Sequence, residues 1–301
     1  MPGPNAPHRA SLPPRLAFRR MHFERQWYPT PRSPRFYMEP YTIASDRVPG
    51  AEVFAGVEID LVLSGRGGFY LDGRTYELAP GTVFFYDCMI PHDFTTPGPD
   101  KLELLGAHML VDAVIAAGPV PGDLRLYEPF VALRSGFSPL VAGPEEIAGQ
   151  LRDAWEICRS RGPDWDLLAW SRVHAALTGV RAGFAEMVAE QRNPSWLQHT
   201  SLAAAAIEFI HQRYAEPIGL EGIARACACS VSSLSHVFSQ VMHVSPIEYR
   251  NRLRVVRAME LLCGSNEKLS RIAAQVGFES LSQFHDLFRR VTGRTPASVR
   301  G

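Results

Sequence analysis

The chain lacks the features that mark membrane and secreted proteins. Its 301 residues contain no run of 18 apolar residues, and Met1 is followed by prolines and arginines instead of an apolar signal core. The five cysteines are odd in number and irregularly spaced, which argues against a disulfide framework and against a four-ligand zinc site. We therefore expect a cytoplasmic protein with reduced cysteines and no membrane partner.

A net charge is also missing, because 31 basic side chains balance 31 acidic ones. The balance does not hold locally: residues 199–301 carry 12 basic and 8 acidic side chains, a net charge of +4, and the remainder has a net charge of −4. Nearly all the basic residues are arginines, which suit contacts to phosphate and guanine, although a GC-rich genome encodes arginine by default. The excess is modest, and its place favours a DNA contact near the C-terminus.

Motifs of common enzyme classes are absent too. We find no P-loop, no dinucleotide-binding motif, no G-x-S-x-G motif and no Ser-His-Asp pattern. We accordingly predict no catalytic residue, no cofactor and no enzyme activity. A chain of this length with 46% hydrophobic residues favours two domains.

The pattern of apolar residues changes three times along the chain. Residues 1–20 are rich in proline and arginine and predict a disordered tail. Residues 21–140 contain short apolar runs separated by Gly, Asp and Pro, which predict a β-barrel or jelly roll with hairpin turns at Gly65–Gly68, Asp72-Gly73 and Pro80-Gly81. Residues 141–192 show helical periodicity and predict two helices for dimerisation or for packing on the barrel, followed by a linker at Asn193-Pro194-Ser195.

An internal repeat occupies residues 199–301. Ile223-Ala224, Phe238 and Pro246 recur as Ile272-Ala273, Phe288 and Pro296, shifted by 49 positions for the first pair and 50 for the rest. Each copy predicts a short helix, a turn and a second helix, which is helix-turn-helix organisation. A helical solenoid is the alternative, but solenoids usually need three or more units. The predicted fold class is therefore α+β multidomain, with an N-terminal β-barrel or jelly roll with helices and a C-terminal all-α tandem helix-turn-helix.

The second helix of each copy has an inward pair of apolar residues four apart, Leu234 with Phe238 and Phe284 with Phe288. The opposite faces should meet DNA, because recognition helices read base edges in the major groove. The predicted base-reading residues are Ser232, Ser235, His236, Ser282, His285 and Asp286.

A long helix from Pro246 to Gly264 is predicted between the copies. It carries several arginines, some of which should contact phosphate and some of which should pair with Glu248 or Glu260. The predicted phosphate contacts, including those on the second helix of each copy, are Ser239, Arg250, Arg254, Arg257, Arg289 and Arg290.

The C-terminal segment GFESLSQFHDLFRRVTGRTPASVR resembles the signature of the AraC/XylS-type transcriptional regulators, with Gly-Phe, two phenylalanines four apart, Gly-x-Thr-Pro and a closing Arg. The resemblance covers about residues 200 to 300 and implies two helix-turn-helix units joined by a long helix. It also implies that an arginine commonly stands two residues before the closing Phe of each recognition helix. This sequence has His236 and Asp286 there, and an acidic side chain can accept a hydrogen bond from cytosine N4.

The strand-rich segment resembles the cupin-like sensor domain of the same family, with Glu58 and Gly65 spaced as in a cupin first motif. The paired histidines that should precede this glutamate are missing, so only His92 and His108 are at hand and we predict no metal site. Barrel interiors bind small molecules and this segment is aromatic, which predicts an effector pocket, with a sugar as one candidate effector. The predicted pocket residues are Trp27, Phe69, Phe84, Tyr86 and His92.

Together these observations predict a sequence-specific DNA-binding transcriptional regulator controlled by a small-molecule effector in the N-terminal barrel. The family resemblance implies an activator more often than a repressor. Double-stranded DNA, a small-molecule effector, a second copy of the chain and RNA polymerase are the expected partners. The alternative is a cupin-type small-molecule binding module or metalloenzyme with a helical assembly tail.

Overall fold

The computed structural model describes residues 36–43, 56–88, 90, 92–97, 101–115, 117–119, 123–133, 136–190, 194–242, 244–292 and 295–300. The predicted tail at 1–20 and Trp27 therefore lie outside the described residues. The chain forms two compact units. The first contains Phe36–Leu110 and Phe137–Val188, and the second contains Val111–Gly136 and Ala189–Gly301.

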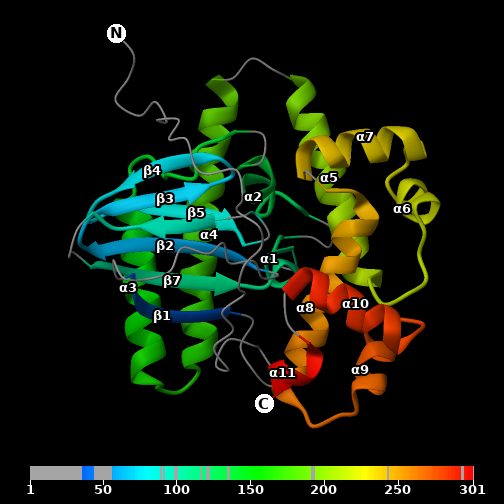
Figure 1. Cartoon of the computed structure of the whole chain (residues 1–301). Coiled ribbons are helices and arrows are strands. Elements are labelled where there is room, and N and C mark those ends of the chain that lie inside the picture. Colours follow the sequence, from blue (N-terminus) through cyan, green and yellow to red (C-terminus); the bar gives the residue numbers. More distant parts are fainter. Residues whose placement is uncertain are drawn as a thin grey trace. The chain divides into compact units, whose positions relative to one another are not determined.

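The first unit is built on two antiparallel sheets (Figure 1). The four-stranded sheet has the order β1 (Phe36–Ile43), β7 (Leu102–Met109), β2 (Val57–Ser64), β5 (Val83–Asp87). The three-stranded sheet has the order β4 (Arg74–Leu78), β3 (Gly67–Leu71), β6 (His92–Thr95). Rings from both sheets meet between them, since the centroid of Phe69 on β3 is 4.9 Å from those of Phe84 and Tyr86 on β5. The predicted strand-rich fold is confirmed.

The predicted turns have different outcomes. Asp72 and Gly73 both have positive φ, 48° and 85°, and close the β3–β4 hairpin as a tight two-residue turn. The hairpin prediction is wrong at Gly65–Gly68 and at Pro80-Gly81, because each joins strands of different sheets. Turn residues report a local change of direction, whereas the pairing of the flanking strands is decided by distant residues.

Two long helices belong to the same unit, α3 (Glu145–Ser160) and α4 (Trp165–Glu190). They pack on each other closely, because a Cβ at Gly179 on α4 would lie 2.7 Å from Ile147 on α3. They also pack on the sheet, where the ring centroids of Phe36 and Trp170 are 5.6 Å apart. Of the two roles predicted for these helices, the structure shows packing on the barrel.

The second unit is entirely helical in its described parts. Two short helices, α1 (Val111–Ile115) and α2 (Glu128–Ala132), pack against α5 (Pro194–Arg213), and α2 also contacts α7 (Val231–Met242). The sequence analysis assigned the residues of α1 and α2 to the sensor domain. Helix α5 starts at Pro194, inside the predicted linker at 193–195.

The repeat forms the rest of this unit. The first copy has α6 (Leu220–Ala226) and α7 (Val231–Met242), and the second has α9 (Leu269–Gln275) and α10 (Leu281–Thr292), followed by α11 (Pro296–Arg300). Between them runs α8 (Pro246–Gly264), with the bounds predicted for it. Ser245 starts α8 as its N-cap by accepting a hydrogen bond from the backbone N–H of Glu248, 3.1 Å away.

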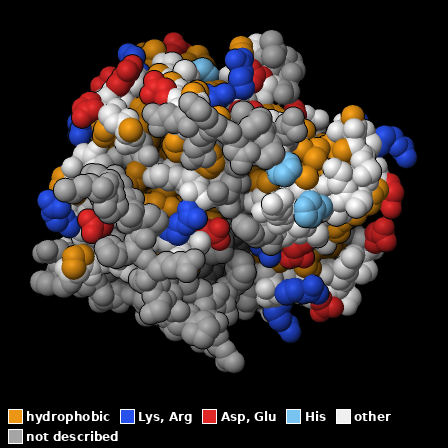
Figure 2. Space-filling model, turned by 90° about the horizontal axis from the view of Figure 1, so that it is seen from above, with side chains coloured by type: hydrophobic (Ala, Val, Ile, Leu, Met, Phe, Trp, Pro, Cys, Tyr) orange, Lys and Arg blue, Asp and Glu red, His pale blue; other side chains and the backbone are white. Residues whose placement is uncertain are grey.

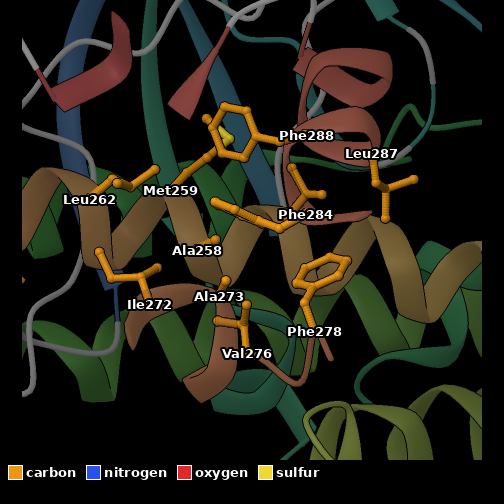
Figure 3. Packing of buried hydrophobic residues seen from close by; sticks show 11 residues of the cluster. Ala258, Met259, Leu262, Ile272, Ala273, Val276, Phe278, Phe284, Leu287 and Phe288 are labelled. Carbon is orange, nitrogen blue, oxygen red and sulfur yellow. The ribbon is translucent and has the colours of Figure 1, made fainter. Parts of the chain in front are cut away.

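Helix α8 contributes to the core of both copies. Near its start, Tyr249 is buried and its ring packs edge-on against Phe238 of α7. Nearer its end, Ala258, Met259 and Leu262 pack against the second copy (Figure 3). The second-copy residues in this cluster are Ile272, Ala273, Val276, Phe278, Phe284, Leu287 and Phe288. The apolar spacing noticed in the sequence is therefore the spacing of two packed cores.

Substitution of two glycines in the first unit should destabilise the protein to different extents, because one has only a positive φ and the other also has a close neighbour. Gly65 and Gly73 have nearly equal φ, 83° and 85°, but only a Cβ at Gly65 would collide with a neighbour, 2.0 Å from the carbonyl oxygen of Lys101. We expect Gly73→Ala to cost about 1 kcal/mol from the left-handed backbone alone. Gly65→Ala should cost about 1–3 kcal/mol more, because the strand must shift. Thermal unfolding of both variants checks this, and equal losses of stability would contradict the crowding described for Gly65.

Candidate nucleic-acid interface and barrel interior

The second helices of the two copies, α7 and α10, are held in the same way. Ser230 accepts a hydrogen bond from the N–H of Ser233, and Ser280 accepts one from the N–H of Gln283, each at 3.1 Å. These two N-caps confirm that each helix starts at the same point of the repeat. The inward pairs predicted for both helices, Leu234 with Phe238 and Phe284 with Phe288, are fully buried.

The outward faces consist of polar residues. Among the predicted base-reading residues, Ser232, His236, Ser282 and Asp286 are exposed, while Ser235 and His285 are half-buried. The predicted phosphate contacts Ser239, Arg289 and Arg290 are exposed as well. Exposure on the face opposite the core is what contact with DNA requires, and the roles of these residues remain proposals.

The sequence analysis overlooked residues in the first turn of both helices. Val231 and Leu281 start α7 and α10, and they are exposed despite their apolar side chains. Ser233 and Gln283 beside them are also exposed. The i, i+4 spacing used to find the inward pair says little about a helix's first turn, although recognition helices contact base edges there.

The arginines of α8 are placed differently from the prediction. Arg254 is buried, with 6% of its surface exposed, and its guanidinium donates to the backbone carbonyls of Tyr214 at 2.6 Å and Glu216 at 2.9 Å. It is therefore corrected from a phosphate contact to an internal residue. Arg250 is half-buried and donates to the carbonyl of Ile218. The guanidinium of Arg257 lies 5.9 Å from the ring centroid of Tyr214.

One of the predicted ion pairs within α8 is present. Arg252 contacts Glu248, one helical turn before it, at 3.1 Å. On the face drawn in Figure 2, basic and acidic side chains are interspersed and form no patch of a single sign. Among the arginines predicted to contact phosphate, Arg289 and Arg290 of α10 are exposed, whereas Arg250 and Arg257 of α8 are half-buried.

Four of the five predicted pocket residues meet between the two sheets. The ring of Tyr86 lies 4.6 Å from that of His92, and Phe69 is 4.9 Å from Phe84. All four side chains are buried. The fifth residue, Trp27, lies outside the described residues. The structure thus brings Phe69, Phe84, Tyr86 and His92 together, without testing whether they bind a ligand.

A buried polar cluster adjoins these rings. Glu58 on β2 contacts Nδ1 of His108 on β7 at 2.7 Å, accepts a hydrogen bond from the hydroxyl of Tyr86, and has the thiol of Cys88 at 3.4 Å. Asp60, two residues further along β2 on the same face, accepts a hydrogen bond from the hydroxyl of Tyr41 at 2.9 Å. The other oxygen of Asp60, Oδ1, is buried without a hydrogen-bond partner among the described residues.

The sequence analysis used Glu58 and His108 only to test a cupin metal motif, and it did not consider Asp60 at all. Polar and apolar residues alternate along β2, a pattern typical of a strand with one exposed face. Glu58 and Asp60 are nevertheless buried, as are Val57, Ile59 and Leu61 on the opposite face. Both faces of the strand are covered, so alternation alone could not reveal the cluster.

The two carboxylates differ in protonation. Burial alone would raise the pKa of Glu58, but the charge of His108 and hydrogen bonds from His108 and Tyr86 lower it below its ordinary value. Burial and the neighbouring charge of Glu58 raise the pKa of Asp60 well above the ordinary aspartate value, which outweighs the hydrogen bond from Tyr41. The cluster therefore pairs one ionised carboxylate with one that holds its proton more tightly.

No group of three or more His, Cys, Asp or Glu side chains in the described part of the chain could hold a metal ion. Within the same residues, no helix is both long and apolar enough to cross a membrane.

Tandem capped recognition helices and a two-sheet barrel in one chain define a class of protein, the helix-turn-helix regulators with a cupin-like domain. Comparison with protein families agrees: residues 223–301 match the helix-turn-helix domain family and residues 55–108 match the cupin domain family. The HTH-type transcriptional activator RhaS of Escherichia fergusonii is 35% identical over 256 residues, which cover 81% of this chain and 84% of that protein. The chain belongs to the AraC family of transcriptional regulators.

Some other relatives match over a shorter length of the chain. The bifunctional transcriptional activator/DNA repair enzyme AdaA of Bacillus subtilis is 31% identical over 93 residues, 31% of this chain and 44% of that protein. Among solved structures, ToxT of Vibrio cholerae has a TM-score of 0.52 at 15% identity and covers 88% of this chain and 96% of its own, which shows a shared fold. The family confirms the expectation of a DNA-binding regulator that is not an enzyme, and it disfavours the metalloenzyme alternative.

The raised pKa of Asp60 gives a testable dependence on pH. Because folding increases the proton affinity of Asp60, its contribution to stability falls as the pH rises from the ordinary aspartate value to the raised one, by about 1.4 kcal/mol for each pH unit. Asp60→Asn removes this loss and keeps an acceptor for Tyr41. We expect the variant to gain thermal stability relative to wild type as the pH rises above the ordinary pKa of aspartate. Glu77→Gln, an exposed position on β4, is the control. A difference between Asp60→Asn and wild type that stays constant with pH would contradict the assignment.

Proposed function

We propose that this chain is a transcriptional activator that reads two adjacent DNA boxes and is controlled by a small molecule bound in its N-terminal barrel. One observation carries the DNA part of the proposal: α7 and α10 begin at equivalent serine caps, bury equivalent apolar pairs and expose polar residues on the opposite faces. The relative RhaS is named as a transcriptional activator, which supports the sign of regulation.

The proposed reading of DNA uses the exposed faces of both helices. Ser232, Ser235 and His236 contact bases of one box, and Ser282, His285 and Asp286 contact bases of the other. Ser239, Arg289 and Arg290 hold phosphates, with contributions from Arg250 and Arg257 where their guanidinium groups reach the surface. The 19 residues of α8 span roughly 28 Å, close to the 34 Å of one DNA turn, so the two boxes lie about one turn apart.

The proposed effector site is the barrel interior, formed by Phe69, Phe84, Tyr86 and His92 next to the Glu58–Asp60 cluster. Its support is chemical: an Asp60 that keeps its proton and has a buried oxygen without a partner suits a neutral ligand with hydroxyl groups, such as a sugar. ToxT, whose fold this chain shares, has been solved with an unsaturated fatty acid bound, which keeps an apolar acid as the second candidate.

Effector binding would act by shifting the population of arrangements between the barrel and the reading helices. Within this proposal the chain works in the cytoplasm as a homodimer and contacts RNA polymerase at the promoter. Chemical cross-linking and light scattering, with and without effector, test the dimer.

The DNA part is tested by selecting bound sequences from random duplex DNA with the full chain. Enrichment of a non-palindromic site with two boxes about one turn apart supports the proposal. If nothing is enriched even at low salt, where phosphate contacts are strongest, the proposal is wrong.

Asp286 offers a prediction at the level of one base. A carboxylate accepts a hydrogen bond from cytosine N4, whereas an amide matches adenine N6 and N7. We expect Asp286→Asn to change the preferred base at one position of one box from cytosine to adenine, with the other positions unchanged. Selection with the variant and the wild type in parallel measures this. An unaltered base profile would show that Asp286 only pairs with a neighbouring arginine.

The effector part predicts a ligand-specific gain in stability. A neutral sugar at about 100 times its Kd should stabilise the wild type by about 2.7 kcal/mol, measured as a rise in thermal midpoint. The gain should shrink in Asp60→Ala, which removes both the donor and the acceptor that the protonated carboxyl would offer to a ligand hydroxyl. A fatty acid that stabilises the protein when sugars do not would establish the second candidate. No response to either class would contradict an effector site in the barrel.

A further inference from the structure

A short segment that leads into the first copy is held against the second copy. Residues 214–218, between α5 and α6, are followed directly by the first helix-turn-helix, yet α8 and the turn of the second copy contact them. We call these five residues the 214–218 segment. Its contacts decide how the two reading helices are oriented relative to each other.

Arg254 makes the central contact. Its buried guanidinium donates to the carbonyls of Tyr214 and Glu216, at 2.6 and 2.9 Å, and lies 5.7 Å from the ring centroid of Phe278 in the second copy. One side chain on α8 therefore touches both copies at once. Burial, and then the positive charge of Arg250, lower the pKa of Arg254 to about 10, so it remains charged at neutral pH.

Gly277 makes an independent contact to the same segment. It forms the turn after α9 with a φ of 88°, and a Cβ there would lie 2.3 Å from the carbonyl oxygen of Ala215. The turn of the second copy thus lies directly on the backbone of the 214–218 segment. Only glycine allows both the positive φ and this close approach.

Two more contacts hold the segment. Tyr214 packs against the hydrophobic core of the second copy, and the guanidinium of Arg257 lies over its ring. Arg250 donates to the carbonyl of Ile218. Three arginines of α8 and the Gly277 turn therefore hold the 214–218 segment against α8 and the second copy.

We propose that Arg254 is a positioning residue that fixes the spacing of the two DNA boxes, and that it does not contact DNA. The inference rests on the proposed function, because it concerns how the same two helices read DNA. A rigid pair of reading helices accepts only one separation, since one inserted base pair moves a box by about 3.4 Å and turns it by about 35°. Without Arg254, the carbonyls of the 214–218 segment lose their partner and the two copies can adjust.

The experiment measures binding of the full chain to its selected site, and to the same site with one base pair inserted between the boxes. The wild type should lose affinity on the order of 100-fold on insertion, because the contacts to one box are lost. Arg254→Met keeps an apolar stem of similar length and should bind the original site up to about tenfold more weakly. Its loss on insertion should fall to about tenfold or less.

Two further variants make the result specific. Arg252→Met makes the same change two residues away on α8, where the arginine pairs with Glu248, and should keep the wild-type loss on insertion. Arg289→Ala removes a proposed phosphate contact and should reduce the salt slope of log K by about 0.9, whereas Arg254→Met should leave that slope unchanged. If Arg254→Met fails to fold, Arg254→Lys decides, with an intermediate loss on insertion expected.

The proposal is wrong if a folded Arg254 variant loses as much affinity as the wild type when one base pair is inserted between the boxes. It is also wrong if the variant has a reduced salt slope of log K but the wild-type loss of affinity on insertion, because Arg254 would then be a phosphate contact. Binding of the wild type to its selected site shows separately that the proposed function holds, so the two failures are distinguishable.

Discussion

The second unit depends on one constraint: α8 has to satisfy two cores at once. Its first turns pack Tyr249 against Phe238, and its later turns pack Ala258, Met259 and Leu262 against the second copy. A helix that is needed by two neighbours is buried on most of its surface, which explains why even Arg254 lies inside. The guanidinium can be buried because backbone carbonyls at the end of α5 accept its hydrogen bonds. An apolar residue at position 254 would leave those carbonyls without hydrogen-bond donors, whereas the arginine supplies them.

The barrel follows a different principle. Both faces of β2 are covered, so Glu58 and Asp60 have to find partners inside the protein. His108 and Tyr86 supply them for Glu58, but Tyr41 serves only one oxygen of Asp60. A buried polar atom without a partner is unfavourable, and proteins tend to keep such atoms where a ligand or a proton compensates for them. Aromatic side chains thus fill the interior of the first unit, and the carboxylates of Glu58 and Asp60 are buried next to them.

Much of this organisation could be predicted from the sequence, because it depends on local signals. Apolar pairs four apart and a proline at the start of α8 lie within a few residues of the helices they define, and these predictions were correct. Predictions that depend on contacts between residues far apart in the sequence were less successful. The glycines at Gly65 and Gly81 do form turns, but the strands they join belong to different sheets. Arg254 looked like its neighbours on α8, since nothing nearby in the sequence reveals the carbonyls of the 214–218 segment. The roles of the exposed residues on α7 and α10 are not decided by the fold alone.

The shared helix also limits how this architecture can diverge. Each residue added to α8 would rotate everything after it by about 100° and advance it by about 1.5 Å. A single insertion would therefore turn α10 relative to α7 and move Gly277 away from Ala215, even if both cores stayed intact. Insertions in α8 are tolerable only near whole numbers of helical turns, and most of those would still separate the copies. New target sites are more accessible through substitutions on the exposed faces of α7 and α10 than through changes in the length of the helix between them.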